Sequence, residues 1–251
     1  MTAFLRQTKL RKLRKGEKEK FKMTETILWD VDGTLLDFKA AEKAAIRSLF
    51  KEFSFGACSD EMIARYSEIN RRCWEKLERG EIEKSRMLEE RFEIFFKEEG
   101  LDVSAAEKFN ERYQVSLGDT VAYKDDSYDI LKSLQEKYGQ YAVSNGTIVA
   151  QTKKLKNSGL GDLFDGVFLS EELGAEKPCK EFFDRVFSVI GEDKKDKALI
   201  VGDSLSSDIS GGINAGIKTC WYNPDGVKNN GEIKPDYEIS DLHEIYKILR
   251  L

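Results

Sequence analysis

Helical periodicity dominates one continuous part of this chain. Between residues 39 and 118, apolar residues recur at spacings of three and four, which is typical of amphipathic helices. The expected helices cover residues 40–53, 60–78, 84–98 and 104–117. No strand pattern interrupts them, so we expect residues 39–118 to form an all-helical domain.

Short apolar runs characterise the remainder. Runs at 141–143, 166–169, 198–201 and 219–222 alternate with helical stretches, and a similar run lies at 27–29. Such alternation predicts βαβ units and a parallel sheet. We therefore expect an α/β fold: a Rossmann-like parallel sheet core of residues 23–38 and 119–251, with helices on both faces and residues 39–118 inserted after the first strand. The hinges are expected near Asp37-Phe38 and Gly118-Asp119.

Composition places the chain among soluble globular proteins. No apolar run approaches the roughly 18 residues that a membrane span needs, so we expect no membrane partner. The four cysteines are scattered and form no CxxC pair, which favours reduced thiols and a cytoplasmic location. We expect them to be buried or half-buried as small apolar residues. His243 is the only histidine, which argues against mechanisms that need a histidine base or a histidine-rich metal site.

Residues 1–22 differ in charge from the rest of the chain. They contain nine Lys or Arg and two Glu, whereas the whole chain has a net charge of −5, so the remainder is strongly acidic. The segment lacks the continuous apolar stretch of a secretory signal. We expect a disordered or loosely helical extension, with Met23 as the functional start of the domain. A contact with nucleic acid or an anionic membrane is the alternative, although no nucleic-acid partner is expected.

Two carboxylates follow the apolar run 27–29 in the sequence Asp30-Val31-Asp32-Gly33-Thr34. Alternate residues of an extended segment point to the same side, so Asp30 and Asp32 are expected to converge. They would lie at the carboxyl end of a strand, where open α/β sheets bind their ligands. Gly33 would let the backbone turn sharply there. The pair is suited to metal binding, to acid–base chemistry or to both.

Polar residues also follow the later strand runs. They are Ser144-Asn145-Gly146 after 141–143, Lys177 before Pro178, and Asp203 and Asp208 after 198–201. A hydroxyl, an amide and turn N–H groups suit the oxygens of an anion, although a structural turn also explains them. The proline favours an extended, exposed backbone at Lys177. Asp208 has a helix N-cap as its alternative role.

Taken together and in this order, these elements resemble the haloacid-dehalogenase-like (HAD) phosphohydrolase superfamily over residues 24–251. The helical insertion (residues 39–118) resembles the type C1 cap of that superfamily. The resemblance implies a Mg²⁺-dependent phosphomonoesterase that works through an aspartyl-phosphate. An Asp at position 32 favours phosphatases over the dehalogenases of the superfamily.

The resemblance also implies a role for each core residue. Asp30 would be the nucleophile, and its ordinary pKa of about 3.9 leaves it ionised at neutral pH without a base. Asp32 would protonate the leaving oxygen and then activate water. Ser144, Asn145 and Lys177 would bind the phosphoryl group. The Mg²⁺ ligands would be Asp30, the Asp32 backbone carbonyl and Asp203, with Asp208 in a supporting position.

Further residues resemble the bacterial pyrimidine 5′-nucleotidase branch. They are Asp37-Phe38, Asn70 with Trp74, Arg91-Phe92, Ser144-Asn145-Gly146 with Gln151, and the segments 170–174 and 214–224. Val31 and Gly33 depart from the residues common in that branch. Phe38, Asn70, Trp74 and Phe92 are the candidates for substrate specificity, together with Tyr66 and Arg71. A pyrimidine needs a flat apolar surface and a few polar groups, but aromatic residues at helical spacing are also typical of core packing.

Three functions therefore stand beside each other. The first is a nucleotidase for pyrimidine nucleoside monophosphates. The second is a phosphatase or phosphomutase for another small metabolite, such as phosphoglycolate or a sugar phosphate. The third is a non-catalytic binding protein on the same fold. The expected partner is a small-molecule phosphomonoester, and the chain is expected to be a monomer or homodimer.

Overall fold

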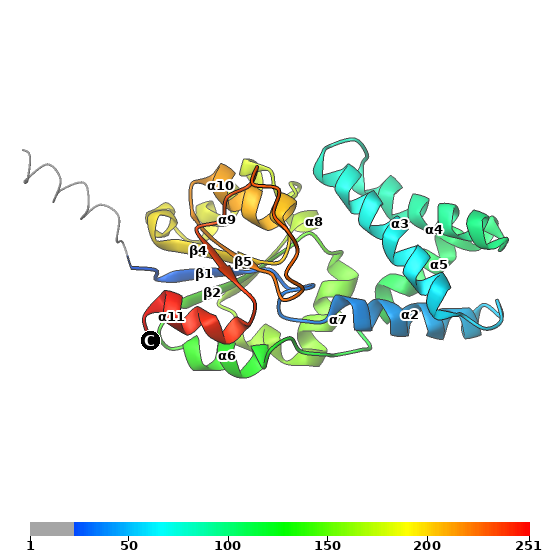
Figure 1. The fold of residues 1–251 in the computed structure, drawn as a ribbon, viewed down its shortest axis with the longest axis horizontal. Coiled ribbons are helices and arrows are strands. Elements are labelled where there is room, and N and C mark those ends of the chain that lie inside the picture. Colours follow the sequence, from blue (N-terminus) through cyan, green and yellow to red (C-terminus); the bar gives the residue numbers. More distant parts are fainter. Residues whose placement is uncertain (1–22) are drawn as a thin grey trace, which may run out of the picture.

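The computed structural model describes residues 23–251, and the prediction for the basic extension 1–22 lies outside them. The described strands form one parallel sheet in the order β3-β2-β1-β4-β5-β6, and Figure 1 labels four of them, β1, β2, β4 and β5. Their bounds are β1 Thr26–Trp29, β2 Gly139–Ser144, β3 Gly166–Leu169, β4 Ala198–Gly202, β5 Lys218–Tyr222 and β6 Tyr237–Ile239. The predicted α/β fold class is confirmed.

Helices cover both faces of this sheet. They are α6 Ser127–Leu134, α7 Ile148–Ser158, α8 Ser170–Leu173, α9 Lys180–Ile190, α10 Ser210–Ala215 and α11 Ile245–Leu249. Figure 1 shows α6 and α11 on one side of the sheet and α9 and α10 on the other. Single turns of tighter or wider helix complete the core: η2 Leu160–Leu163, η3 Glu192–Lys197, the π-helical turn η4 Leu205–Ile209 and η5 Leu242–Glu244.

The central strand β1 determines where a ligand can bind. Ile27 and Trp29 pack into the cluster that includes α6 and α11, whereas Leu28 packs into the cluster with α9. Burial on both faces explains the continuous apolar run. Because β1 pairs with β2 on one side and with β4 on the other, the strand order reverses at β1. Ligands of open α/β sheets bind at the carboxyl ends of the strands at this point.

Four helices and one short helical turn lie between β1 and α6 and make up the helical insertion. It consists of α2 Phe38–Glu52, α3 Asp60–Glu78, α4 Lys84–Glu99, the turn η1 Val103–Ala105 and α5 Ala106–Ser116. Asp37 caps α2 by accepting a hydrogen bond from the Ala40 N–H at 3.0 Å, which fixes where the insertion begins. Its own aromatic core includes Phe50, Phe95 and Phe109.

Three details differ from the sequence predictions. The edge strand β6 was not expected, because it has only three residues and two of them are exposed. Asp208 does not cap a helix; Ser204 caps η4 by accepting from the Ser207 N–H at 3.1 Å. Cys179 is exposed, whereas small buried cysteines were expected. Within the described residues, no helix is long and apolar enough to cross a membrane.

Candidate active site

A cavity of about 680 Å³ lies between the carboxyl ends of the central strands and the helical insertion. Its volume is in the range that holds small-molecule ligands. All the core residues predicted for the site border it: Asp30, Asp32, Ser144, Asn145, Lys177, Asp203 and Asp208. The sheet edge therefore brings these side chains together.

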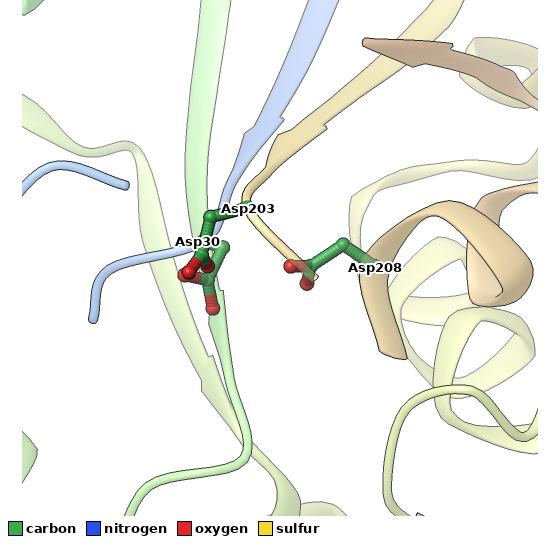
Figure 2. Close-up of side chains that lie close together, drawn as sticks. All are labelled: Asp30, Asp203 and Asp208. Atoms are coloured by element: carbon green, nitrogen blue, oxygen red, sulfur yellow. The ribbon is translucent and has the colours of Figure 1, made fainter. Parts of the chain in front are cut away.

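Three carboxylates converge on the floor of the cavity. Asp30 follows β1, Asp203 follows β4 and Asp208 lies in η4, and one oxygen of each lies within 4.8 Å of the others (Figure 2). Asp203 keeps an exposed surface, whereas Asp30 and Asp208 are buried. Such a set of hard oxygen donors with an excess of negative charge matches the ligands that Mg²⁺ prefers.

Lys177 supplies the positive charge in this cluster. Its Nζ donates to Asp30 Oδ1 at 2.8 Å, to Asp208 Oδ1 at 2.6 Å and to the Val143 carbonyl at 2.9 Å. Only 1% of its surface is exposed, so the exposed backbone expected before Pro178 is not found. Burial opposes its charge, but Asp208 and Asp30 outweigh burial and hold the Lys177 pKa above its ordinary value.

One ammonium does not balance three carboxylates. Burial raises the pKa of Asp30 to about 7, although Lys177 acts in the opposite direction. Desolvation, followed by the negative charges of Asp30 and Asp208, raises the pKa of Asp203 well above its ordinary value. Burial thus acts against the ionised form of Asp30 that the sequence led us to expect at neutral pH. A divalent cation beside these groups would favour their charged forms.

The turn after β1 packs closely against Asp203. Gly33 has φ +95°, and a Cβ atom there would lie 2.3 Å from Asp203 Oδ2. Thr34 Oγ1 lies 3.0 Å from Asp30 Oδ2, to which it donates, and 3.4 Å from Asp203 Oδ1. No role was predicted for Thr34, although it stands in the motif four residues after Asp30.

The two residues after β2 have different surroundings. Ser144 Oγ accepts from the Gly146 N–H at 3.0 Å and borders the cavity. The Asn145 side chain instead holds the backbone of Lys177: Nδ2 donates to the Lys177 carbonyl at 2.8 Å, and Oδ1 accepts from the Lys177 N–H at 2.9 Å. The sequence had suggested that the Asn145 side-chain amide binds an anion. Instead, this amide positions the backbone of Lys177 and is not free for an anion.

Asp32 is held by helix α7. Its Oδ2 accepts from Gln151 Nε2 at 2.6 Å, and its Oδ1 accepts from Lys154 Nζ at 2.5 Å. The Lys154 side chain is buried and its Nζ lies 5.0 Å from the centre of the Phe38 ring. No role was predicted for Lys154. Lys154 follows Gln151 by three residues on a helix. This spacing would have predicted that the two side chains lie on the same helix face.

The predicted specificity residues separate into two groups. Phe38, Asn70 and Trp74 border the cavity, as does Arg71. Phe92 does not border it: the ring is 0% exposed and stacks on Tyr66 with centroids 4.8 Å apart in the core of the insertion. The prediction that Phe92 contacts substrate was wrong, because this aromatic at helical spacing serves packing.

The charged groups on the cavity floor determine which chemistry the site can perform. Asp30 offers a carboxylate beside a fixed ammonium, and Asp32 offers a second carboxyl group from the same turn. Because the wall opposite comes from the helical insertion, the groups suited to hold an anion lie apart from those that could contact the rest of a ligand. These features suit nucleophilic attack on a phosphoryl group.

Comparison with known proteins gives a consistent result. Residues 27–222 match the family model of the haloacid dehalogenase-like hydrolases. The chain is 40% identical to the HAD-hydrolase YfnB of Bacillus subtilis over 92% of this chain and 97% of YfnB. A crystal structure of YfnB bound to magnesium, which reveals interdomain movement, covers 92% of this chain and 100% of that chain, with a TM-score of 0.86 and 39% identity.

Two further relatives carry a substrate in their names. The pyrimidine 5′-nucleotidase PynA of Streptococcus pneumoniae is 37% identical over 89% of this chain and 94% of its own length. The pyrimidine 5′-nucleotidase YjjG of Escherichia coli is 30% identical over 89% of this chain and 96% of its own length.

Proposed function

Since the chain belongs to the haloacid dehalogenase-like hydrolases, we propose that it is a phosphomonoesterase whose nucleophile is Asp30. The observation that carries this proposal is the position of Asp30 at the end of the central strand, in contact with Lys177 and beside Asp203 and Asp208. The cavity above it has room for a small phosphate ester.

In the first step, a carboxylate oxygen of Asp30 attacks phosphorus while the bond from phosphorus to the ester oxygen breaks. Asp32 gives its proton to that oxygen, so the alcohol leaves uncharged. In the second step Asp32 takes a proton from water, whose oxygen attacks phosphorus. The bond between Asp30 and phosphorus breaks, inorganic phosphate is released and both carboxyl groups return to their initial state.

Several groups would hold the phosphoryl oxygens during both steps. The Lys177 ammonium is fixed by Asp208 and by the Val143 carbonyl, so it acts as a preorganised positive charge. The Ser144 hydroxyl and the Asn145 N–H are the other proposed phosphoryl contacts. Asp30, Asp203, Asp208 and the Asp32 backbone carbonyl would hold Mg²⁺. A bound Mg²⁺ supplies positive charge that offsets the repulsion between an anionic nucleophile and an anionic phosphate.

The helical insertion would act as a cap that recognises the leaving group, and the leaving group we propose is a pyrimidine nucleoside. Trp74 and Phe38 border the cavity and offer flat surfaces for a base. Two relatives named pyrimidine 5′-nucleotidases match this chain over almost its whole length, which supports the proposal. The cytoplasmic location and the monomeric or homodimeric state stay predictions.

A substrate panel tests this proposal. Steady-state rates with Mg²⁺ are compared for UMP, dTMP, phosphoglycolate and glucose 1-phosphate, and repeated with EDTA. We expect the highest kcat/KM for the two nucleotides and loss of activity with EDTA. Equal or better rates for either non-nucleotide would replace the nucleotidase with another small-metabolite phosphatase.

A further inference from the structure

A polar group on the wall of the cavity has no part in the proposed phosphoryl chemistry. Glu42 of α2 lies beside Ser67 and Asn70 of α3, and all three border the cavity. Glu42 and Asn70 are 2% and 3% exposed, whereas Ser67 is only partly buried. The Ser67 hydroxyl is therefore the most accessible part of this group.

Hydrogen bonds determine where the Ser67 hydroxyl directs its proton. Ser67 Oγ donates to Glu42 Oε1, while Asn70 Nδ2 donates to Glu42 Oε2 at 2.9 Å. The Tyr113 hydroxyl lies 3.4 Å from the same Oε2. Three donors thus converge on Glu42, as suits a carboxylate that can only accept. With its single proton directed at Glu42, the Ser67 oxygen presents lone pairs, not a proton, to a molecule in the cavity.

Asn70 is fixed in the same orientation by a buried cation. Its Oδ1 accepts from Arg91 Nη1 at 2.8 Å, and Arg91 Nη2 donates to Asn110 Oδ1 at 3.1 Å. The amide oxygen must therefore face Arg91, and the amide nitrogen must face Glu42. Burial raises the pKa of Glu42, whereas the hydrogen bonds from Ser67 and Asn70 act in the opposite direction.

The surrounding wall carries more negative than positive charge. Its carboxylates are Glu42, Glu68, Glu75 and Glu78, and its cations are Lys39 and Arg71. Arg71 donates to both Glu68 and Glu75, and Lys39 pairs with Asp225 at 3.2 Å. Both cations are thus engaged with carboxylates, and the charged residues that border the wall keep a negative excess, which would repel an anionic leaving group.

We propose that Ser67, positioned by Glu42, contacts the leaving group and selects an uncharged one that presents an N–H or O–H donor. This inference rests on the proposed function and deepens it. The uracil and thymine bases are uncharged and offer one ring N–H, whereas the carboxylate of phosphoglycolate is anionic.

A pair of nucleotides tests the donor requirement. UMP offers the ring N–H, and 3-methyluridine 5′-monophosphate lacks it. The ratio of their kcat/KM values is measured for the wild type, Ser67→Ala and Glu42→Gln. In Glu42→Gln, the side-chain carbonyl is expected to stay with the donors Asn70 and Tyr113, which leaves the new NH₂ group facing Ser67. Ser67 then accepts from residue 42 and turns its proton toward the cavity.

The expected ratio favours UMP by about tenfold in the wild type. Ser67→Ala should bring it close to one, and Glu42→Gln should bring it to one or invert it. Glutamine is nearly isosteric with glutamate, so a preference caused by the bulk of the methyl group would survive in Glu42→Gln. A wild-type ratio retained by that variant overturns the proposal. Circular dichroism and thermal unfolding establish that both variants fold.

A second pair of substrates contains no nucleotide and tests the charge requirement. The wild type should prefer 4-carbamoylphenyl phosphate to 4-carboxyphenyl phosphate by about tenfold, and Glu42→Gln should reduce that preference. Glu68→Gln removes the same charge from a wall residue already paired with Arg71, and it should reduce the preference less. Equal effects of both variants, or no preference in the wild type, overturn the role of Glu42.

The two proposals can fail separately. If kcat/KM for glucose 1-phosphate exceeds that for UMP while the preference for the carbamoyl substrate holds, only the nucleotidase proposal fails.

Discussion

Each carboxylate on the cavity floor has a different environment, although all lie close together. Asp30 contacts Lys177 and Thr34, whereas Asp32 contacts Gln151 and Lys154. A buried carboxylate beside a fixed ammonium suits a nucleophile, because the ammonium also attracts the phosphoryl oxygens. Asp32 is only partly buried and borders the cavity, so its carboxyl group is accessible to a molecule bound there.

Asp30→Asn should remove the nucleophile and leave the fold intact. We expect kcat to fall by about 10⁴-fold or more, since loss of a nucleophile removes the covalent route. The thermal midpoint should stay the same or rise, because one of three mutually repelling carboxylates is gone. Steady-state assays with Mg²⁺ and thermal unfolding measure both. Asp225→Asn, a change in an exposed ion pair with Lys39, is the control and should keep activity. Substantial turnover by Asp30→Asn would exclude the covalent mechanism.

Gly33→Ala tests the close approach between the β1 turn and Asp203. The new Cβ would strain a residue at φ +95° and meet Asp203 Oδ2 at 2.3 Å. We expect a loss of about 1–3 kcal/mol in the free energy of unfolding and a higher Mg²⁺ concentration for half-maximal activity. Urea unfolding and a Mg²⁺ titration of activity provide the readouts.

Gly56→Ala is the matched control for this substitution. Gly56 has φ +86°, but no atom lies within 4 Å of a Cβ built there. The backbone strain is therefore similar, and the clash is absent. We expect Gly56→Ala to lower stability without changing the Mg²⁺ requirement. A similar shift in both variants would mean that the contact with Asp203 is unimportant.

The sequence predicted the acidic residues of the site better than the residues that hold them. Asp30, Ser144 and Asp203 each follow an apolar run, so strand ends alone place them at one edge of the sheet. The contacts of Gln151 and Lys154 with Asp32 join positions more than a hundred residues apart and depend on how α7 packs. The orientation of the Ser67 hydroxyl, which donates to Glu42, likewise depends on the arrangement of two helices.

Helix α7 connects the two sides of the cavity. Its N-cap Thr147 donates to Gln114 Oε1 of α5 at 2.8 Å, so the start of the helix is attached to the insertion. Gln151 and Lys154, on the next turns, hold both oxygens of Asp32. Helix α7 thus contacts both the insertion and Asp32, the residue proposed as general acid and base. The position of the insertion can therefore affect the orientation of Asp32.

Lys154→Met should leave Asp32 held at one oxygen only. We expect kcat to fall by about 10²-fold, the scale of a small misplacement of a catalytic group. KM should change less, because Lys154 does not border the cavity. Methionine preserves the packing of the buried stem. Lys154→Arg, which keeps a donor, should recover part of the rate.

Lys153→Met is the control beside it on the same helix. Lys153 pairs with Asp119 at 2.5 Å and has no contact with Asp32 among those the structure describes. We expect nearly wild-type kcat. If both lysine variants lost activity equally, the cause would be damage to α7 and not the loss of the contact with Asp32.

At the level of elements, long periodic helices and buried strands were predictable, whereas marginal ones were not. Helices α2 to α5 repeat apolar residues over three or more turns, which gives an unambiguous pattern. β6 has three residues at the edge of the sheet, and only Ile239 is buried. Its pairing with β5 fixes it, and that information is absent from its local sequence.

Lys84 is one of the side chains that connect the helical insertion to the core. Lys84 of α4 donates to Ser170 Oγ at 2.9 Å and lies 3.4 Å from both the Gly146 carbonyl and Glu171 Oε1. Ser206 donates to Glu78 Oε2 at 2.5 Å. Because Gly146 belongs to the proposed phosphate-binding turn, Lys84 connects the insertion to the backbone that we propose to bind the phosphoryl oxygens.

Lys84→Met should weaken the closed arrangement, by which we mean the described one with the insertion held against the core, without disturbing the carboxylates of the cavity floor. A buried charge-assisted hydrogen bond typically contributes about 1.5–3 kcal/mol, so its loss should shift the balance toward an open arrangement by tenfold or more. We expect KM to rise by up to about tenfold while kcat changes less. The radius of gyration from small-angle X-ray scattering should increase.

Arg86→Met separates this effect from a general effect on α4. Arg86 is exposed on the same helix and pairs with Glu89, Glu90 and Glu93 of α4 itself, not with the core. Its loss should leave the radius of gyration and KM unchanged. If Lys84→Met raised KM with no change in the radius of gyration, Lys84 would act on the phosphate-binding turn alone. If neither quantity changed, contacts such as that of Ser206 with Glu78 would suffice to hold the insertion closed.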